Sequence, residues 1–77
     1  MAVKIYTTST CPWCKKTKAF FKANKVKFTE IDVGINQKAA KEMIKKSGQM
    51  GVPVTDINGE IIVGYNESAL KKALKLK

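Results

Sequence analysis

Two cysteines separated by two residues carry the clearest chemistry in this sequence. Cys11 and Cys14 enclose Pro12 and Trp13, after a strand-like run and a short polar loop, at the start of a predicted helix. A Cys-x-x-Cys pair in that context is typical of a redox pair, because this spacing brings the two sulfurs within disulfide-bonding reach. The predicted chemistry is thiol–disulfide exchange, in which one sulfur attacks a substrate disulfide and the other releases the product.

The helix start predicts different roles for the two sulfurs. Pro12 suits the first helical position, which places Cys11 at the N-cap. There, unsatisfied backbone N–H groups and the positive end of the helix dipole stabilise a thiolate, and Lys15 and Lys16 are expected to add to that stabilisation. Cys14 lies one turn further along and is expected to be less exposed and less acidic. Cys11 is therefore the predicted nucleophile and Cys14 the resolving cysteine.

Other uses of two cysteines are a pair of inert structural thiols, or half of a metal or iron–sulfur site shared between two chains. The sequence has no histidine, which removes Cys/His catalysis and the commonest zinc ligand. Two cysteines cannot complete a four-ligand zinc site within one chain. Redox chemistry is the favoured interpretation, with no resident metal expected, and an iron–sulfur carrier is kept as an alternative.

The charge is strongly positive, and every positive side chain is a lysine. The formal net charge is +9, which raises the possibility of a nucleic-acid-binding module. The lysines, however, are scattered over every predicted helix, and no arginine is present for bidentate phosphate or base contacts. Solvated helix faces are the preferred interpretation, with no nucleic acid as partner. The charge could still steer anionic thiols or acidic proteins toward the chain.

Length and composition indicate one small globular domain over residues 1–77. Hydrophobic residues make up 44% and charged residues 27% of the chain, which is ordinary for a folded protein. The longest apolar runs, such as Ile61-Ile62-Val63, are far too short to span a membrane, and the first residues lack the features of a secretory signal. A cytoplasmic monomer without membrane contact is expected.

Strand formers, caps and turn residues predict the order β-α-β-α-β-β-α. Asn36 and Asn66 are good N-caps, Gly48 suits a helix end, and Asn58-Gly59 is a strong hairpin signal. The predicted segments are strands at 3–6, 28–32, 52–57 and 60–63, a polar loop at 7–10, and helices at 12 to about 24, 37–47 and from 67 onward. A right-handed crossover makes the first two strands parallel. The result is an α/β domain with a four-stranded mixed sheet flanked by three helices.

Three motifs carry a family resemblance over essentially the whole chain. The segment from Ile5 to Cys14 resembles the glutaredoxin active-site region, with Trp13 where Tyr or Phe is usual. Gly51-Val52-Pro53 is similar to the family's Thr-Val-Pro, and Val63-Gly64 falls where Gly-Gly is expected. The resemblance implies a thioredoxin-like fold, a cis peptide before Pro53, and a Val52 backbone that pairs with substrate like an added strand. It also implies glutathione as co-substrate, with no tightly bound cofactor.

Several positions depart from the family pattern. Thr8 stands where many glutaredoxins carry Lys, Gln49-Met50 where a basic residue is common, and Asn66 where the family has Asp. These changes predict weakened glutathione binding. The stretch at 64–66 also resembles that of NrdH-type redoxins, which implies a reductase flavoprotein as the alternative electron donor and disulfide-containing proteins as substrates.

Seven residues are predicted to contact substrate: Thr8, Trp13, Val52, Pro53, Gly64, Tyr65 and Asn66. Trp13 is expected to be partly exposed at the helix start, where an aromatic side chain favours a contact surface over a core position. Tyr65 is interpreted either as a packed aromatic at a strand end or as a substrate contact.

Overall fold

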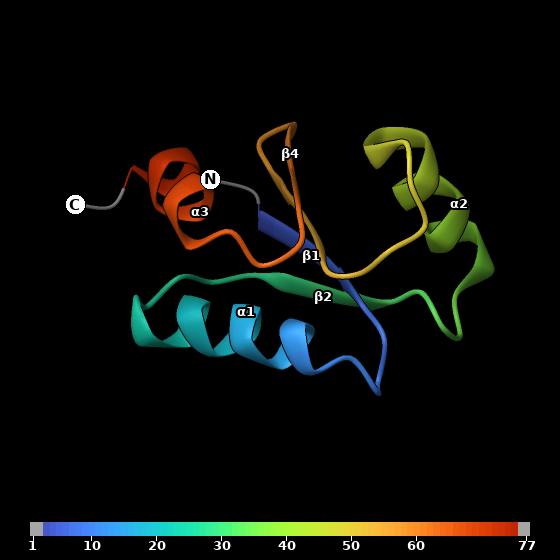
Figure 1. Ribbon diagram of the computed structural model, residues 1–77, viewed down its shortest axis with the longest axis horizontal. Coiled ribbons are helices and arrows are strands. Elements are labelled where there is room, and N and C mark those ends of the chain that lie inside the picture. The colour runs from blue at the N-terminus through green and yellow to red at the C-terminus, as the bar shows by residue number, and fades with distance from the viewer. Residues whose placement is uncertain (1–2, 76–77) are drawn as a thin grey trace.

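The computed structural model describes residues 3–75 and confirms the predicted order of elements (Figure 1). These elements are β1 (Val3–Thr7), α1 (Pro12–Ala23), β2 (Thr29–Asp32), α2 (Gln37–Ser47), β3 (Val54–Ile57), β4 (Glu60–Val63) and α3 (Glu67–Leu74). A single domain is expected over residues 1–77. Its outer ends, 1–2 and 76–77, lie outside the described residues.

The four strands form one mixed sheet in the order β2-β1-β3-β4, as predicted. β1 pairs in parallel with β2 and antiparallel with β3, and β3 pairs antiparallel with β4. The β3–β4 hairpin turns at Asn58 and Gly59, whose φ angles of 52° and 92° match the left-handed turn that an Asn-Gly pair favours. The parallel β1–β2 pair brings the ends of both strands, and the loops that follow them, to one edge of the sheet.

Helices cover both faces of the sheet because apolar side chains alternate along the central strands. On one face, Ile5 of β1 belongs to the cluster that α1 and α3 cover with Phe20, Phe21 and Leu70. On the other face, the core residues are Tyr6 and Val54 from the sheet and Ala39 and Met43 from α2. β1 is thus packed on both faces of the sheet. Because the loop to Cys11 leaves the end of β1, this packing fixes the position of the α1 N-terminus.

The predicted helix caps are confirmed. Asn36 Oδ1 accepts the Ala39 N–H at 3.0 Å, and Asn66 Oδ1 accepts the Ala69 N–H at 3.1 Å. Gly48 ends α2 with a φ of 74°, a conformation that costs glycine little.

Three predicted boundaries are shifted by one or two residues. Thr7, the first residue of the predicted loop, instead continues β1 opposite Asp32 and is 1% exposed. The second strand begins at Thr29 rather than Phe28, whose side chain packs against the core. The third begins at Val54 rather than Val52, since Pro53 has no N–H to donate to a strand ladder. Helix α1 ends at Ala23, with Asn24 as its C-cap.

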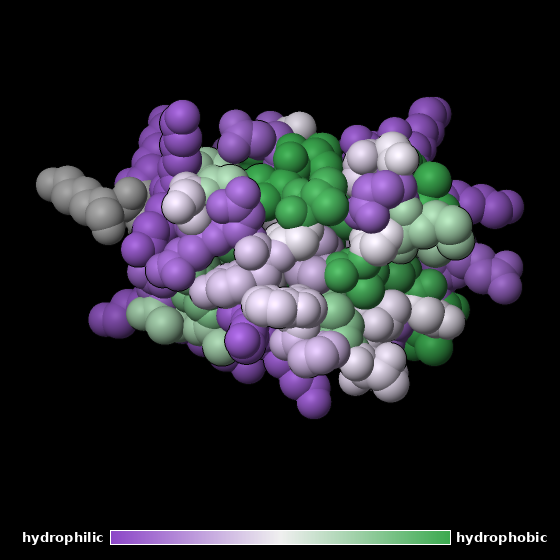
Figure 2. Space-filling view, viewed as in Figure 1, coloured by the Kyte–Doolittle hydropathy of each residue, from purple (hydrophilic) through white to green (hydrophobic). Residues whose placement is uncertain are grey.

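Figure 2 shows hydrophilic side chains projecting from much of the outline, with apolar residues in the upper middle and the right half of this face and residues of intermediate hydropathy at its centre. A few large apolar side chains are nevertheless exposed: Trp13, Ile35, Met50 and Val63. No helix within residues 3–75 has the length and apolar content needed to cross a bilayer.

Candidate functional site

Both cysteines lie at the beginning of α1 and are free thiols. Cys11 is the N-cap, with Pro12 in the first turn, and its sulfur accepts the backbone N–H of Cys14 at 3.2 Å. This is the hydrogen bond that an N-cap side chain ordinarily makes, and here it reaches a sulfur that becomes more strongly accepting as a thiolate. Cys11 is 9% exposed and Cys14 only 1%, so the expected difference in accessibility is confirmed.

Burial separates the chemistry of the two sulfurs. It raises the pKa of Cys14 to about 12, and the hydrogen bond and charge of Cys11 act in the same direction. Two groups oppose this rise: the backbone N–H of Thr8, which donates to the Cys14 sulfur, and the positive charge of Lys18. The prediction that Cys14 is the less acidic position agrees with this environment.

The loop before β3 closes the site on the side of Cys11. The Cys11 thiol donates to the backbone carbonyl of Val52, with a sulfur–oxygen distance of 3.8 Å. The peptide bond between Val52 and Pro53 is cis, as the resemblance implied. Gly64 N–H donates to Pro53 O at 2.8 Å, so segments 11–14, 52–53 and 64–65, far apart in sequence, meet at one place.

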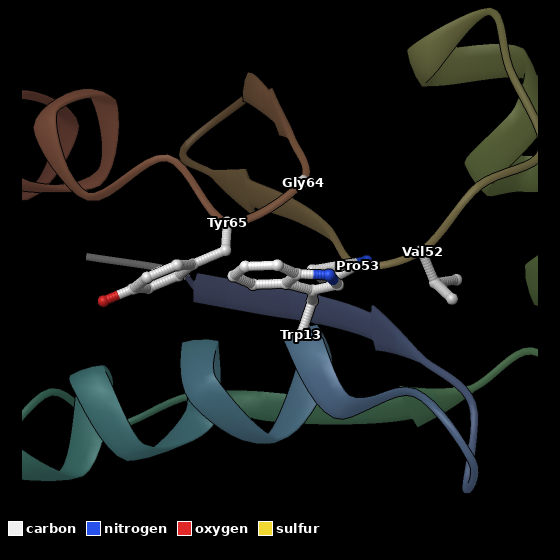
Figure 3. Close-up of a pocket in the computed structure, with 5 residues that line it drawn as sticks. All are labelled: Trp13, Val52, Pro53, Gly64 and Tyr65. Carbon is white, nitrogen blue, oxygen red and sulfur yellow. The ribbon is translucent and has the colours of Figure 1, made fainter.

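An open pocket of about 230 Å³ lies at this meeting point, lined by Trp13, Val52, Pro53, Gly64 and Tyr65 (Figure 3). Trp13 is 53% exposed, which confirms its expected exposure. Its indole stacks on Tyr65 at a centroid distance of 6.2 Å and an interplanar angle of 25°. Because Tyr65 also meets the edge of Phe20, it is both packed against the core and part of the pocket wall.

Two residues predicted to contact substrate have other roles in the structure. Thr8 uses its backbone, accepting the Cys11 N–H at 3.3 Å and donating to Cys14. Asn66 uses its side-chain oxygen to cap α3. Neither side chain lines the pocket. The remaining five predicted contact residues are brought together around it.

The lysines after the Cys-x-x-Cys motif are exposed. The ammonium group of Lys16 lies 4.5 Å from the centroid of the Trp13 ring, a cation–π arrangement that fixes one face of the indole. The thiolate-stabilising role assigned to Lys15 and Lys16 stays a prediction.

Sequence reasoning missed the ion pair made by Lys18, which lies one turn after Cys14 on α1. Lys18 Nζ lies 2.8 Å from Glu30 Oε2 on β2, and the same carboxylate oxygen accepts the hydroxyl of Thr7 at 2.9 Å. The four-residue spacing from Cys14 to Lys18 could have indicated that they share a helix face. Nothing local in the sequence indicates that Glu30 lies opposite them.

Within the described residues, no group of three or more His, Cys, Asp or Glu side chains is arranged to hold a metal ion. Cys11 and Cys14 offer two thiols in unequal environments beside an apolar pocket.

Comparison with known proteins agrees with this geometry. The sequence model of the glutaredoxin family matches residues 3–62. The chain belongs to the glutaredoxin family. A glutaredoxin-like 8.6 kDa protein of the rubredoxin operon in Clostridium pasteurianum, itself uncharacterised, is 45% identical over 73 residues, covering 95% of this chain and 97% of that protein.

Solved structures confirm the thioredoxin-like fold. The glutaredoxin grx-1 of Archaeoglobus fulgidus superimposes with a TM-score of 0.88 at 34% identity, covering 97% of this chain and 88% of its own. The glutaredoxin-like NrdH-redoxin of Escherichia coli gives a TM-score of 0.85 at 24% identity, covering 94% and 93%, a likeness of fold alone.

Proposed function

We propose that this glutaredoxin family member is a dithiol thiol–disulfide oxidoreductase, with Cys11 as nucleophile and Cys14 as resolving cysteine. The Cys11 thiolate attacks one sulfur of a substrate disulfide, forms a mixed disulfide and releases one substrate thiolate, which takes up a proton. Cys14 then loses its proton and attacks the Cys11 sulfur, releasing the second substrate thiol. The substrate disulfide is reduced to two thiols as the two cysteines become a disulfide. The observation that carries this proposal is the unequal placement of the two sulfurs at one helix start.

The first step also prepares the second. In the reduced protein, Cys11 helps to hold the pKa of Cys14 high, because the Cys11 sulfur accepts a hydrogen bond from the Cys14 thiol and its charge as a thiolate opposes a second negative charge. Once Cys11 is in a mixed disulfide, its sulfur carries no negative charge and is a weaker acceptor for the Cys14 thiol, so both contributions shrink. Burial then remains, opposed by Thr8 N–H and Lys18. Cys14 thus becomes easier to ionise at the moment when it must attack.

The pocket beside Cys11 favours disulfides presented by protein segments. Its wall includes two aromatic rings and Pro53, a surface suited to apolar side chains next to a substrate cysteine. Val52 lies outside the strands and presents its carbonyl toward Cys11. Its backbone is the proposed pairing edge for an extended substrate segment.

Glutathione is the proposed small co-substrate, bound more weakly than in relatives with charged site residues. The Asn66 carbonyl is neutral and already accepts the Ala69 N–H, whereas an ammonium group is best met by a carboxylate. Gln49 offers no cation, and its side-chain amide is already hydrogen-bonded to Gly51. Its Oε1 accepts the Gly51 N–H at 2.7 Å, and its Nε2 donates to the Gly51 carbonyl at 3.0 Å. Because these observations weaken the case for glutathione, a reductase flavoprotein is kept as the second candidate donor.

A cytoplasmic location is proposed because the reaction requires a compartment that keeps Cys11 and Cys14 reduced. A monomer suffices for the proposed chemistry, since both sulfurs belong to one helix.

An NADPH-coupled disulfide reduction assay tests the proposal, with glutathione plus glutathione reductase in one arm and thioredoxin reductase alone in the other. We expect turnover with a protein disulfide in at least one arm. Cys11→Ser should abolish activity, and Cys14→Ser should spare only the reduction of glutathione mixed disulfides. Full activity in Cys11→Ser, or no turnover of any disulfide by the wild-type protein, would overturn the proposal.

A further inference from the structure

An ion pair between α1 and β2, whose lysine lies one turn after Cys14, is hydrogen-bonded to the end of β1. Lys18 extends from α1 to Glu30 on β2, at 2.8 Å. Glu30 accepts the hydroxyl of Thr7 at 2.9 Å, at the end of β1. The next residue, Thr8, donates its backbone N–H to the Cys14 sulfur. The charge of Lys18 thus acts on the Cys14 sulfur, whereas neither Lys18 nor Glu30 lines the pocket.

Lys18 is positioned to act on that sulfur. Side chains four residues apart on a helix have Cβ atoms about 5–6 Å apart and lie on the same face. The ion pair with Glu30, whose side chain is 41% exposed and also accepts the Thr7 hydroxyl, favours one direction of the long Lys18 side chain. Its side chain is only 26% exposed, so solvent screens its charge less than that of a free surface lysine.

We propose that Lys18 is a positioning residue for the resolving step, in which its ammonium group, restrained by Glu30, stabilises the Cys14 thiolate as that thiolate attacks the Cys11 mixed disulfide. The inference rests on the proposed dithiol function. The bond changes are those already given: the sulfur–sulfur bond between Cys11 and the substrate breaks, the Cys11–Cys14 bond forms, and the substrate leaves as a thiol. Lys18 contributes charge and exchanges no proton with either sulfur.

The expected size of the effect follows from Coulomb's law. We take the charge separation to be about the 6 Å Cβ spacing, and the effective dielectric constant to be about 40–80 because the ion-pair partner Glu30 is 41% exposed. One unit charge then changes the thiolate population about 3- to 10-fold. A less stabilised thiolate is also a stronger nucleophile, with a Brønsted coefficient of about 0.4–0.5, so about half of the logarithmic effect survives in the rate. Loss of the charge should slow the resolving step about two- to fourfold.

A stopped-flow reaction with the aromatic disulfide DTNB separates the two steps. The first released aromatic thiolate reports attack by Cys11, and the second reports intramolecular attack by Cys14. Lys18→Met should slow the second phase about two- to fourfold near neutral pH and leave the first phase unchanged, and Lys18→Arg should restore the second phase. Lys22→Met, one turn further along α1, is the matched control and should behave as wild type.

A second variant separates charge from structure. Glu30→Gln breaks the same ion pair but removes a negative charge instead of a positive one. If Lys18 acts through its charge, Glu30→Gln leaves the second phase equal to or faster than that of the wild type. If the pair only ties α1 to β2, Lys18→Met and Glu30→Gln slow that phase alike, and the inference is overturned.

The pH dependence of the second phase gives the same answer independently. The groups acting on Cys14 are Cys11 and Lys18 from α1 and the Thr8 backbone from the β1 end, with Glu30 facing Lys18 from β2. With Cys11 in a disulfide, Lys18→Met should move the rise of the rate to higher pH, and an unmoved profile would contradict the proposal. These outcomes concern the second phase alone, whereas loss of the first phase in the wild-type protein would reject the dithiol function itself.

Discussion

The burial of Cys14 predicts a thiol that resists alkylation in the reduced protein. With a pKa raised to about 12 by burial, its thiolate fraction at pH 7 is on the order of one in 100,000. An ordinary cysteine, with a pKa of about 8.5, is roughly 3% thiolate at that pH, about 3,000 times more. The more basic Cys14 thiolate is, however, the stronger nucleophile: a Brønsted coefficient of about 0.4–0.5 makes each thiolate about 40 times more reactive. Ionisation alone should therefore make Cys14 about 100-fold slower than a free cysteine.

Limited exposure should slow the reaction further, since Cys14 is 1% exposed. The assay is pulsed alkylation of the reduced protein with iodoacetamide at low conversion, with the modified sulfur identified by peptide fragmentation. Cys11 should be modified first, and the Cys14 rate should rise tenfold per pH unit without a plateau below pH about 10. Cys11→Ser should accelerate Cys14 alkylation, because the charge of Cys11 no longer opposes the thiolate. A plateau below pH about 9, or alkylation of Cys14 as fast as that of a free cysteine, would refute this reasoning.

Three further predictions concern other parts of the molecule. Tyr6→Phe should lower the free energy of unfolding in urea by about 1 kcal/mol, because the buried phenol bonds Glu42 at 3.2 Å and Lys46 at 3.3 Å. Burial raises the pKa of Tyr6, so the unfolded chain loses this proton first and the wild-type protein should lose stability above pH about 10. Tyr6→Phe should reduce that loss, and an unchanged pH dependence in the variant would contradict the prediction. Asn66→Asp should keep the α3 cap and lower the KM for a glutathione mixed disulfide about two- to fivefold, whereas an unchanged KM would show that this position does not meet the glutathione amine. Trp13→Ala should raise the KM for a protein disulfide about 5- to 30-fold with little change for a small aromatic disulfide, and equal effects on both substrates would argue against a contact surface.

Local signals predicted most of the fold. These signals are the two asparagine caps, the glycine that ends α2 and the Asn-Gly hairpin turn. Each one shapes the backbone only a few residues away in the sequence, so it could be recognised from sequence alone. Thr7 could not be placed in the same way. Its polar side chain suggested a loop, but a hydrogen bond to Glu30 at 2.9 Å makes burial at the end of β1 favourable.

The candidate site was predictable at its centre and less so around it. The Cys-x-x-Cys spacing and the proline in the first turn indicated Cys11 and Cys14 from local sequence alone. The pocket depends on segments that meet only after folding, such as Trp13 stacked on Tyr65 at 6.2 Å. The Asn66 oxygen that could have met a ligand instead caps a helix, and Lys18 gained its partner from a neighbouring strand.

Trapping the mixed disulfide tests the central claim most directly. Reduced Cys14→Ser protein would be mixed with an equimolar protein disulfide and separated without reductant, beside the wild-type protein and Cys11→Ser. The dithiol account predicts a covalent complex through Cys11 that accumulates in Cys14→Ser, is released by dithiothreitol and does not form with Cys11→Ser. A complex that forms through Cys14, or that accumulates equally in the wild-type protein, would contradict the assignment of the two sulfurs.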